Sequence, residues 1–210
     1  MGRNKFIFAF LCSVGLLTSI EIYAQDGHYE AIFGKPDTLI KKDIRIYAGF
    51  VHQHQNFFNK AFSFQGIETG IQNKKGLLLG IYGSTFVSNL KIEAEGNSMY
   101  IFISQAGLIA SGIRKGYRKV HAGMLLNTGF FSLTVDESDF RPSKVENPLH
   151  KLNGLVISPQ ILAEFNIANW FKLRTGFGYS FYQHHDQSIV SKEDLNNIFF
   201  SFGFIFGKFN

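Results

Sequence analysis

Long stretches of this chain alternate apolar and polar residues with a period of two. In residues 171–182, Leu173 and Phe177 fall in one phase of the alternation. Lys172 and Arg174 fall in the other phase. Successive side chains of a β-strand point to opposite faces of the sheet, so this period predicts a strand with one apolar and one polar face.

The alternation recurs in eight segments of ten or more residues. Strands of soluble domains have about 5–6 residues, whereas a tilted strand that crosses a bilayer needs about 9–11. Charged residues make up only 18% of the chain, against about 25% in an average globular protein. The pattern therefore favours membrane-crossing strands. We predict strands at 44–53, 62–72, 76–88, 99–113, 118–135, 155–165, 171–182 and 198–209.

Residues 96–113 allow a second interpretation, because they carry no charge and are long enough for a helical span. Ser104, Gln105, Gly107 and Ser111 interrupt the apolar character of this segment. A single helix among seven strands would also leave the sheet unbalanced. We therefore predict a strand here.

The connections between the predicted strands alternate in length. Tight connections are expected at 73–75, 114–117 and 166–169, and longer ones at 53–61, 89–98, 136–153 and 183–197. Short turns at one end and long loops at the other are typical of a transmembrane β-barrel. We predict an all-β fold, an eight-stranded antiparallel up-and-down transmembrane β-barrel preceded by a cleaved signal peptide.

The two phases then predict two environments. The apolar phase faces lipid, and we assign to it Leu173, Phe177, Tyr179, Phe181, Phe200, Phe202, Phe204 and Phe206. The other phase faces the lumen, where we expect a structural polar network of Arg45, Glu68, Gln105, Gln160, Glu164, Lys172 and Arg174. Aromatic girdles near the strand ends are expected from Phe50, Phe165, Phe171, Tyr179, Phe181 and Tyr182.

Eight strands enclose only enough room for side chains, so we expect a packed polar lumen and no channel. Unpaired buried charges are costly, and we therefore expect Glu68 and Glu164 to pair with Arg45, Lys172 and Arg174 across the lumen.

The amino terminus has the features of a secretory signal peptide. Arg3 and Lys5 precede an uncharged apolar run at 6–20, and Ala24 stands at a plausible cleavage site. We expect residues 1–24 to be the signal peptide, 25–43 an N-terminal periplasmic segment and 44–210 the barrel. Cys12 is the one cysteine of the chain, so the mature protein would have no disulfide, thiol catalysis or cysteine-based metal site.

Two motifs resemble small outer-membrane β-barrel proteins of Bacteroidota, a grouping that includes PorT-like proteins linked to type IX secretion. Residues 159–182, PQILAEFNIANWFKLRTGFGYSFY, resemble the penultimate hairpin, and the ending FSFGFIFGKFN resembles the last strand. Residues 101–118 fit more loosely. The resemblance implies a protein of the Gram-negative outer membrane whose last strand is recognised by the barrel-assembly machinery through Gly203, Phe206 and Phe209.

Histidines raise the possibility of chemistry at the outer end. His52, His54, His150, His184 and His185 are expected there, but their spacing matches no fixed ligand pattern, so we interpret them as solvated loop residues. His184, His185, Asp186 and Ser188 contain the residue types of a lipid-modifying enzyme within one loop. We expect no catalytic residue, metal or cofactor, and keep this enzyme as an alternative.

The remaining alternatives concern the location of the barrel and its partners. A secreted, soluble lipocalin-like barrel would place the apolar phase inside and charged residues on the opposite, outer phase of every strand. Segments 76–88 and 99–113 carry almost no charged residues. The net charge of +5 comes from scattered residues, so no nucleic-acid partner is expected. The leading hypothesis is a non-catalytic outer-membrane barrel that contacts outer-membrane lipid and acts through its extracellular loops or as an envelope or secretion assembly component.

Overall fold

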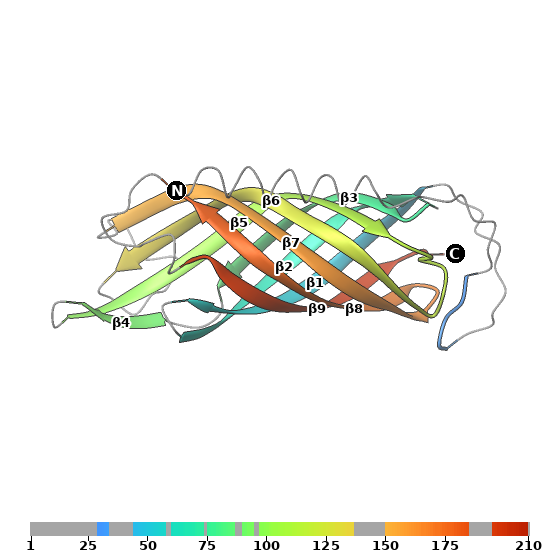
Figure 1. Cartoon of the computed structure of the whole chain (residues 1–210), viewed down its shortest axis with the longest axis horizontal. Helices are drawn as coiled ribbons and strands as arrows, with labels where there is room; N and C mark the ends of the chain where they lie inside the picture. Colours follow the sequence, from blue (N-terminus) through green and yellow to red (C-terminus); the bar gives the residue numbers. More distant parts are fainter. Residues whose placement is uncertain are drawn as a thin grey trace.

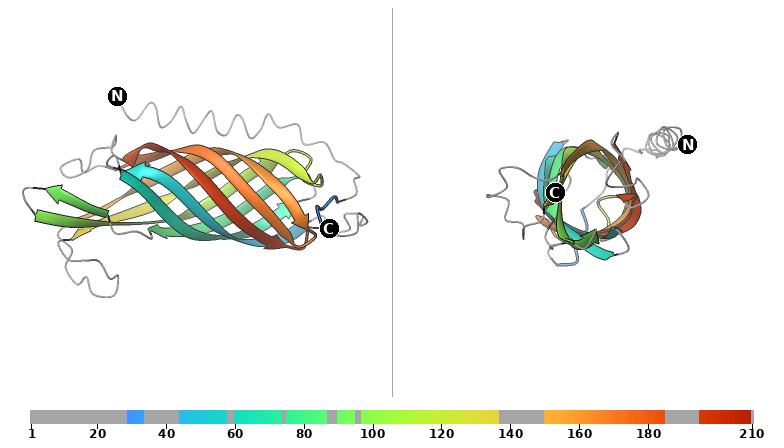
Figure 2. Two further views of the ribbon diagram at one scale, coloured as in Figure 1. Left: turned by 90° about the horizontal axis from the view of Figure 1, so that it is seen from below. Right: turned by 90° about the vertical axis from the view of Figure 1, so that its left-hand side faces the viewer.

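The strands of the protein close into an antiparallel β-barrel, so the predicted fold class is confirmed (Figures 1 and 2). The computed structural model describes residues 29–33, 44–57, 60–73, 75–86, 90–94, 97–136, 150–184 and 195–209. The predicted signal peptide at 1–24 lies outside the described residues.

Nine strands are present in the described residues. They are β1 (Ile44–Phe57), β2 (Lys60–Asn73), β3 (Leu77–Phe86), β4 (Leu90–Ala94), β5 (Asn97–Ile113), β6 (Val120–Asp136), β7 (His150–Ala168), β8 (Phe171–Gln183) and β9 (Asn197–Gly207). Residues 97–113 are a strand, β5, as predicted.

Nine strands make an eight-stranded barrel because β3 and β4 share one side of β5. Leu77–Thr85 of β3 pair with Ser104–Gly112 of β5, and β4 pairs with Asn97–Ile101 farther along the same strand. β4 falls within the predicted connection 89–98, so that part of the prediction is wrong. The β3–β5 pairing closes the barrel, and the ring of strands is visible end-on in Figure 2. Closure leaves no open sheet edge around the barrel wall.

The two ends of the barrel differ. One end, here called the turn end, carries the short connections 74–76, 114–119 and 169–170, and residues 29–33 and 208–209 lie there as well (Figure 1). Gly76 takes φ +90° in the first of these turns, a conformation that favours glycine. The opposite end, here called the loop end, carries the longest connections, 137–149 and 184–196.

The predicted medium-length loop at 53–61 is wrong. β1 and β2 stay paired as far as Phe57 and Lys60, so only residues 58–59 connect them. The reason is that the alternation continues past Gln53: Gln55 and Phe57 also point inward and are buried.

The outer face of the barrel is apolar, as the phases predict. Ile46 is 74% exposed, Phe130 71% and Phe177 52%, and all three alternate with inward-facing neighbours. A soluble barrel would instead cover its outer face mainly with polar and charged side chains. No helix in the described part of the chain has the length and apolar character needed to span a membrane.

The interior contains two apolar clusters. The loop-end cluster consists of Phe57, Phe62, Phe64, Phe86, Ile101, Ile103, Phe131, Leu133, Val135, Val156, Tyr182 and Leu195. The turn-end cluster consists of Tyr29, Ala31, Tyr47, Leu78, Ile109, Ile113, Leu125, Leu162, Ile205 and Phe209. The lumen is therefore not polar throughout, and the buried charged side chains of the described residues lie in the half nearer the turn end.

Candidate functional site

Five buried side chains form a charged cluster inside the barrel: Glu68, His121, Glu164, Lys172 and Arg174. Glu164 lies at its centre. One of its carboxylate oxygens accepts from Arg174 Nε at 2.8 Å, and the other lies 2.9 Å from His121 Nε2 and 3.4 Å from Lys172 Nζ. Arg174 also donates from Nη1 to Glu68 Oε1 at 2.5 Å. One arginine thus links the two carboxylates.

Strand register creates this cluster. His121 of β6 is the direct cross-strand partner of Glu164 of β7, and Glu164 is the partner of Arg174 of β8. Glu68 reaches the cluster from β2, where its cross-strand neighbour on β1 is Gly49. A Cβ on Gly49 would stand 2.6 Å from Ile205 Cδ1 and 3.1 Å from the Cγ of Glu68, so glycine leaves room for both side chains. The adjacent strands β6, β7 and β8 therefore hold the Glu164 carboxylate between His121 on one side and Arg174 on the other.

Arg45 does not join the cluster, and the prediction that it pairs with an acid is wrong for the described residues. Arg45 donates from Nη1 to the carbonyl oxygen of Phe209 at 2.5 Å and from Nη2 to the carbonyl oxygen of Asn73 at 3.3 Å. It is the second residue of β1 and therefore lies next to the turn end. Its role is to hold the carboxyl-terminal segment against the barrel.

The turn end is closed by residues from both ends of the described chain. Tyr29 is buried in the turn-end cluster, and Ile32 and Phe33 donate backbone hydrogen bonds to the carbonyl oxygens of Asn166 and Ile167. Burial raises the pKa of the Tyr29 hydroxyl, so it stays protonated. From the other end, the Phe209 ring is buried, with Lys172 Nζ 4.1 Å from its centre.

Sequence reasoning missed two parts of this region. His121 could have been found, because it shares the inward phase of β6 with Gly123 and Leu125. Tyr29 could not, because the short segment around it has no periodicity that distinguishes an interior residue from a linker residue.

The loop-end half of the lumen holds uncharged polar groups among its aromatic rings. Tyr182 is 2% exposed, accepts a hydrogen bond from Gln55 and lies 3.5 Å from Gln105. Its predicted place in an outer girdle is therefore wrong, because residue 182 belongs to the inward phase of β8. Gln160 likewise points inward and accepts from Ser201 at 2.8 Å.

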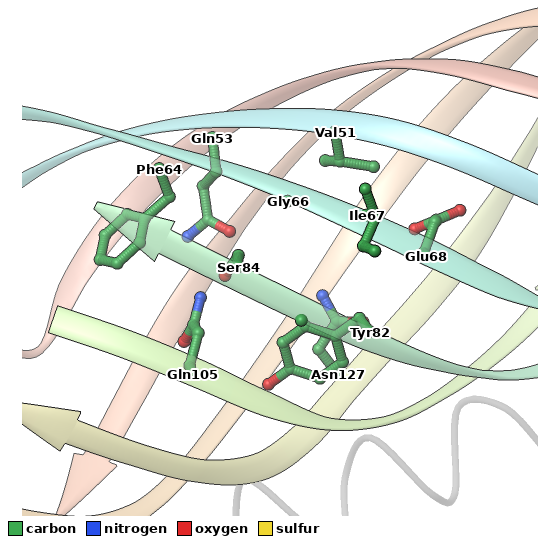
Figure 3. Close-up of a pocket in the computed structure, with 11 residues that line it drawn as sticks. Val51, Gln53, Phe64, Gly66, Ile67, Glu68, Tyr82, Ser84, Gln105 and Asn127 are labelled. Carbon is green, nitrogen blue, oxygen red and sulfur yellow. The ribbon is translucent and has the colours of Figure 1, made fainter. Parts of the chain in front are cut away.

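A small chamber remains between the charged cluster and the loop-end cluster. Glu68, Tyr82, Ser84, Gln105 and Asn127 line it (Figure 3), and its volume is ≈ 30 Å³. A space of this size accommodates about one or two water molecules. Passage of a larger solute would require these side chains to move.

The outward phase carries the residues assigned to the apolar face. Phe177, Tyr179, Phe200, Phe202, Phe204 and Phe206 are exposed there, and Leu173 and Phe181 are partly exposed. Near the turn end, Trp170 stacks on Phe206 at 6.2 Å, and Phe171 stacks on Phe204 at 6.0 Å. This group lies where a girdle is expected, although Trp170 was not among the predicted residues.

The three residues assigned to the assembly signal take different positions. Gly203 faces the lumen, Phe206 faces outward, and Phe209 lies beyond the end of β9 with its ring buried under the barrel. Their role in assembly stays a prediction.

The histidines are dispersed. His52 and His54 lie on the outer face of β1, His150 begins β7, and His184 is buried with its ring 6.5 Å from that of Phe131. His185, Asp186 and Ser188 lie outside the described residues. Among the residues that are described, no three His, Cys, Asp or Glu side chains group as metal ligands.

Comparison with known proteins shows similarity in structure and none in sequence. The chain matches no protein-family model and no curated protein. Neisserial surface protein A is 9% identical, with a TM-score of 0.52 over 79% of this chain and 97% of that chain. The attachment invasion locus protein Ail of Yersinia pestis is 11% identical, with a TM-score of 0.44 over 78% of this chain and 96% of that chain.

A third structure is a major outer membrane protein of Thermus thermophilus, 10% identical, with a TM-score of 0.43 over 79% of this chain and 100% of that chain. At these identities, only the fold can be carried across. The chain thus shares the closed antiparallel barrel fold of Neisserial surface protein A.

Proposed function

We propose that this protein is a non-catalytic barrel of the Gram-negative outer membrane that acts through its loop end. The observation that carries the proposal is the apolar outer face of a closed barrel. Strands such as β8 and β9, with 13 and 11 residues, are long enough to cross a bilayer. A closed barrel also satisfies its backbone hydrogen bonds in lipid, where an open sheet could not.

The loop end is the part of the molecule with surface available for a partner. β5, β6 and β7 extend past the other strands, and with β4 they form a sheet that projects beyond the barrel (Figure 2). Residues 150–154 of β7 pair with β6, whereas pairing of β7 with β8 begins at Leu155 and Gln183. In the proposed orientation this projecting sheet and the loops 137–149 and 184–196 face the exterior.

The filled interior supports binding rather than transport. The apolar clusters and the charged cluster occupy the lumen, and the chamber between them has a volume of only ≈ 30 Å³. We propose that the barrel anchors the loop end rigidly and that the lumen serves stability. An envelope or secretion partner that docks on the same end fits this proposal equally.

Export by a signal peptide, assembly of the barrel through its last strand, and membership of the PorT-like grouping of Bacteroidota belong to the same proposal. Their support is the sequence alone: the basic and apolar amino terminus, the 159–182 motif and the ending FSFGFIFGKFN.

The experiment is topology mapping in intact cells. One epitope is inserted within 137–149 at the loop end and a matched one at the turn 169–170. Antibody should label the first in intact cells and the second only after the outer membrane is permeabilised. The membrane fraction should hold a protein whose migration on a detergent gel changes with heating. A soluble periplasmic monomer, or the reverse labelling pattern, would contradict the proposal.

A further inference from the structure

The outer face of the barrel has an open hollow over β1, β2, β3 and β5, here called the Gly83 hollow, with a volume of ≈ 420 Å³. Its floor includes the inward-phase residues Gly66, Ser84 and Gln105. Phe50, Ile67 and Gly83 line it and lie side by side in register across β1, β2 and β3. All three belong to the outward phase. The hollow is thus part of the face that meets lipid in the proposed function.

Nothing in the described residues explains the glycine at position 83. Cβ atoms on Gly70, Gly107 or Gly129 would stand 2.1–2.2 Å from backbone oxygens of a neighbouring strand, so packing requires glycine at those positions. A Cβ on Gly83 would meet no heavy atom of the described residues within 4 Å. Its φ is not positive, so the backbone does not require glycine either.

Glycine inside a strand weakens the strand and often marks a place where a ligand approaches the backbone closely. Because neither backbone conformation nor internal packing accounts for Gly83, the open space above it points to a molecule outside the chain.

A polar row borders the hollow on the side of the loop end. His52, Gln65 and Thr85 are aligned in register, two residues farther along the same three strands, and they also face outward. The outer face therefore presents an apolar row next to a polar row.

We propose that the Gly83 hollow binds one acyl chain of lipopolysaccharide. The apolar row contacts the hydrocarbon, and the polar row donates and accepts hydrogen bonds at the root of the chain, where amide, ester and hydroxyl groups are present. The position toward the loop end matches the outer leaflet. This inference rests on the proposed function, because it requires the outer face to lie in the outer membrane with the loop end outward.

The test uses the full-length protein extracted from outer membranes in mild detergent, with native mass spectrometry to count the lipids that remain bound. Gly83→Leu places a large apolar side chain in the hollow, starting from a Cβ that meets no heavy atom of the described residues within 4 Å, and Gly83→Ala fills the hollow less. Ala122→Leu is the matched control, since Ala122 is exposed on the outer face of β6, away from the hollow. Each variant is first checked for heat-modifiable migration, which reports barrel assembly and membrane insertion independently of lipid retention.

Wild type and Ala122→Leu should retain one lipopolysaccharide molecule. Gly83→Leu should retain roughly tenfold less, since displacing about two methylene groups removes that much affinity, and Gly83→Ala should be intermediate. Re-addition of purified lipopolysaccharide should restore binding to wild type, and phosphatidylethanolamine should not.

Equal retention by wild type and Gly83→Leu would overturn the inference. So would preferential retention of phospholipid, or a dimer that Gly83→Leu dissolves, which would make the hollow a protein contact. If the wild-type protein itself is not recovered from the outer membrane, the proposed function fails, independently of the hollow.

Discussion

Replacing Glu164 with Gln should destabilise the barrel more than any other neutralisation in its lumen. Glu164 is 1% exposed and is the common partner of Arg174, Lys172 and His121. Glutamine preserves the shape of the side chain but removes its charge. Arg174 would then keep Glu68 as its carboxylate partner, whereas Lys172 would lose the one carboxylate that it contacts among the described residues.

The expected loss follows from the cost of breaking a buried ion pair, which is about 3–5 kcal/mol when one partner is removed. Glu68→Gln is the matched control. It removes one of two carboxylates that contact Arg174, and a hydrogen bond to a charged group contributes about 1.5–3 kcal/mol. Glu164→Gln should therefore exceed Glu68→Gln by about 1–2 kcal/mol.

The assay is reversible denaturant unfolding of the full chain in lipid vesicles. The double variant Glu164→Gln/Lys172→Met adds a direct check, because removal of one uncompensated cation should recover part of the loss. A loss below about 1 kcal/mol for Glu164→Gln, or no recovery in the double variant, would refute a buried cluster centred on Glu164.

Three other outcomes follow from the structure. Phe177→Arg, on the outer face, should cost about 2–4 kcal/mol of unfolding free energy in lipid. Gly176→Ala should cost less, because its new Cβ crowds the side-chain oxygens of Gln160 and Ser201 and stands 3.2 Å from the Ile161 carbonyl oxygen but places no charge in lipid; equal losses would contradict the assigned phases. Tyr29→Ala should cost about 3–5 kcal/mol, whereas Phe33→Ala, at a side chain 70% exposed, should cost little; similar values would mean that Tyr29 does not close the turn end. Purified protein in planar bilayers should give no steady conductance, and a well-defined open channel would contradict the filled lumen.

Alternation predicts most of the barrel because it reports burial directly. Outward residues such as Ile44, Ile67 and Phe200 are exposed, and inward ones such as Glu68 contact other side chains. The two requirements differ so strongly that a single sequence reveals the phase of each strand. Strand ends are less well predicted, because polar residues are acceptable in both strands and loops beyond the apolar face. The extensions of β1 to Phe57 and of β7 to His150 have this origin.

Partners inside the lumen depend on register, which one sequence does not specify. Arg45 and Arg174 look equivalent in the sequence, since both are basic and both fall in an inward phase. Pairing places Arg174 opposite Glu164, whereas Arg45 of β1 faces Gln72 of β2. The same limit applied to His121, whose carboxylate partner is 43 positions away in the chain.

The two halves of the lumen are stabilised by different interactions, mainly aromatic packing near the loop end and ion pairs nearer the turn end. Buried charges need fixed partners, and here those partners come from four strands of the barrel. The loop-end half is held by hydrogen bonds between uncharged groups such as Gln55 and Tyr182 and by close packing. Rings such as Phe57, Phe131 and Tyr182 provide the packing through edge-to-face contacts 5.0–5.7 Å apart. Packing of this kind tolerates changes of side chain better than an ion-pair cluster does, provided that the volume is conserved. Sequence change in the loops and in the wall beneath them is therefore least restricted at the end that we propose meets a partner. The charged cluster, at the other end, joins β2, β6, β7 and β8 through ion pairs that each depend on the register of those strands.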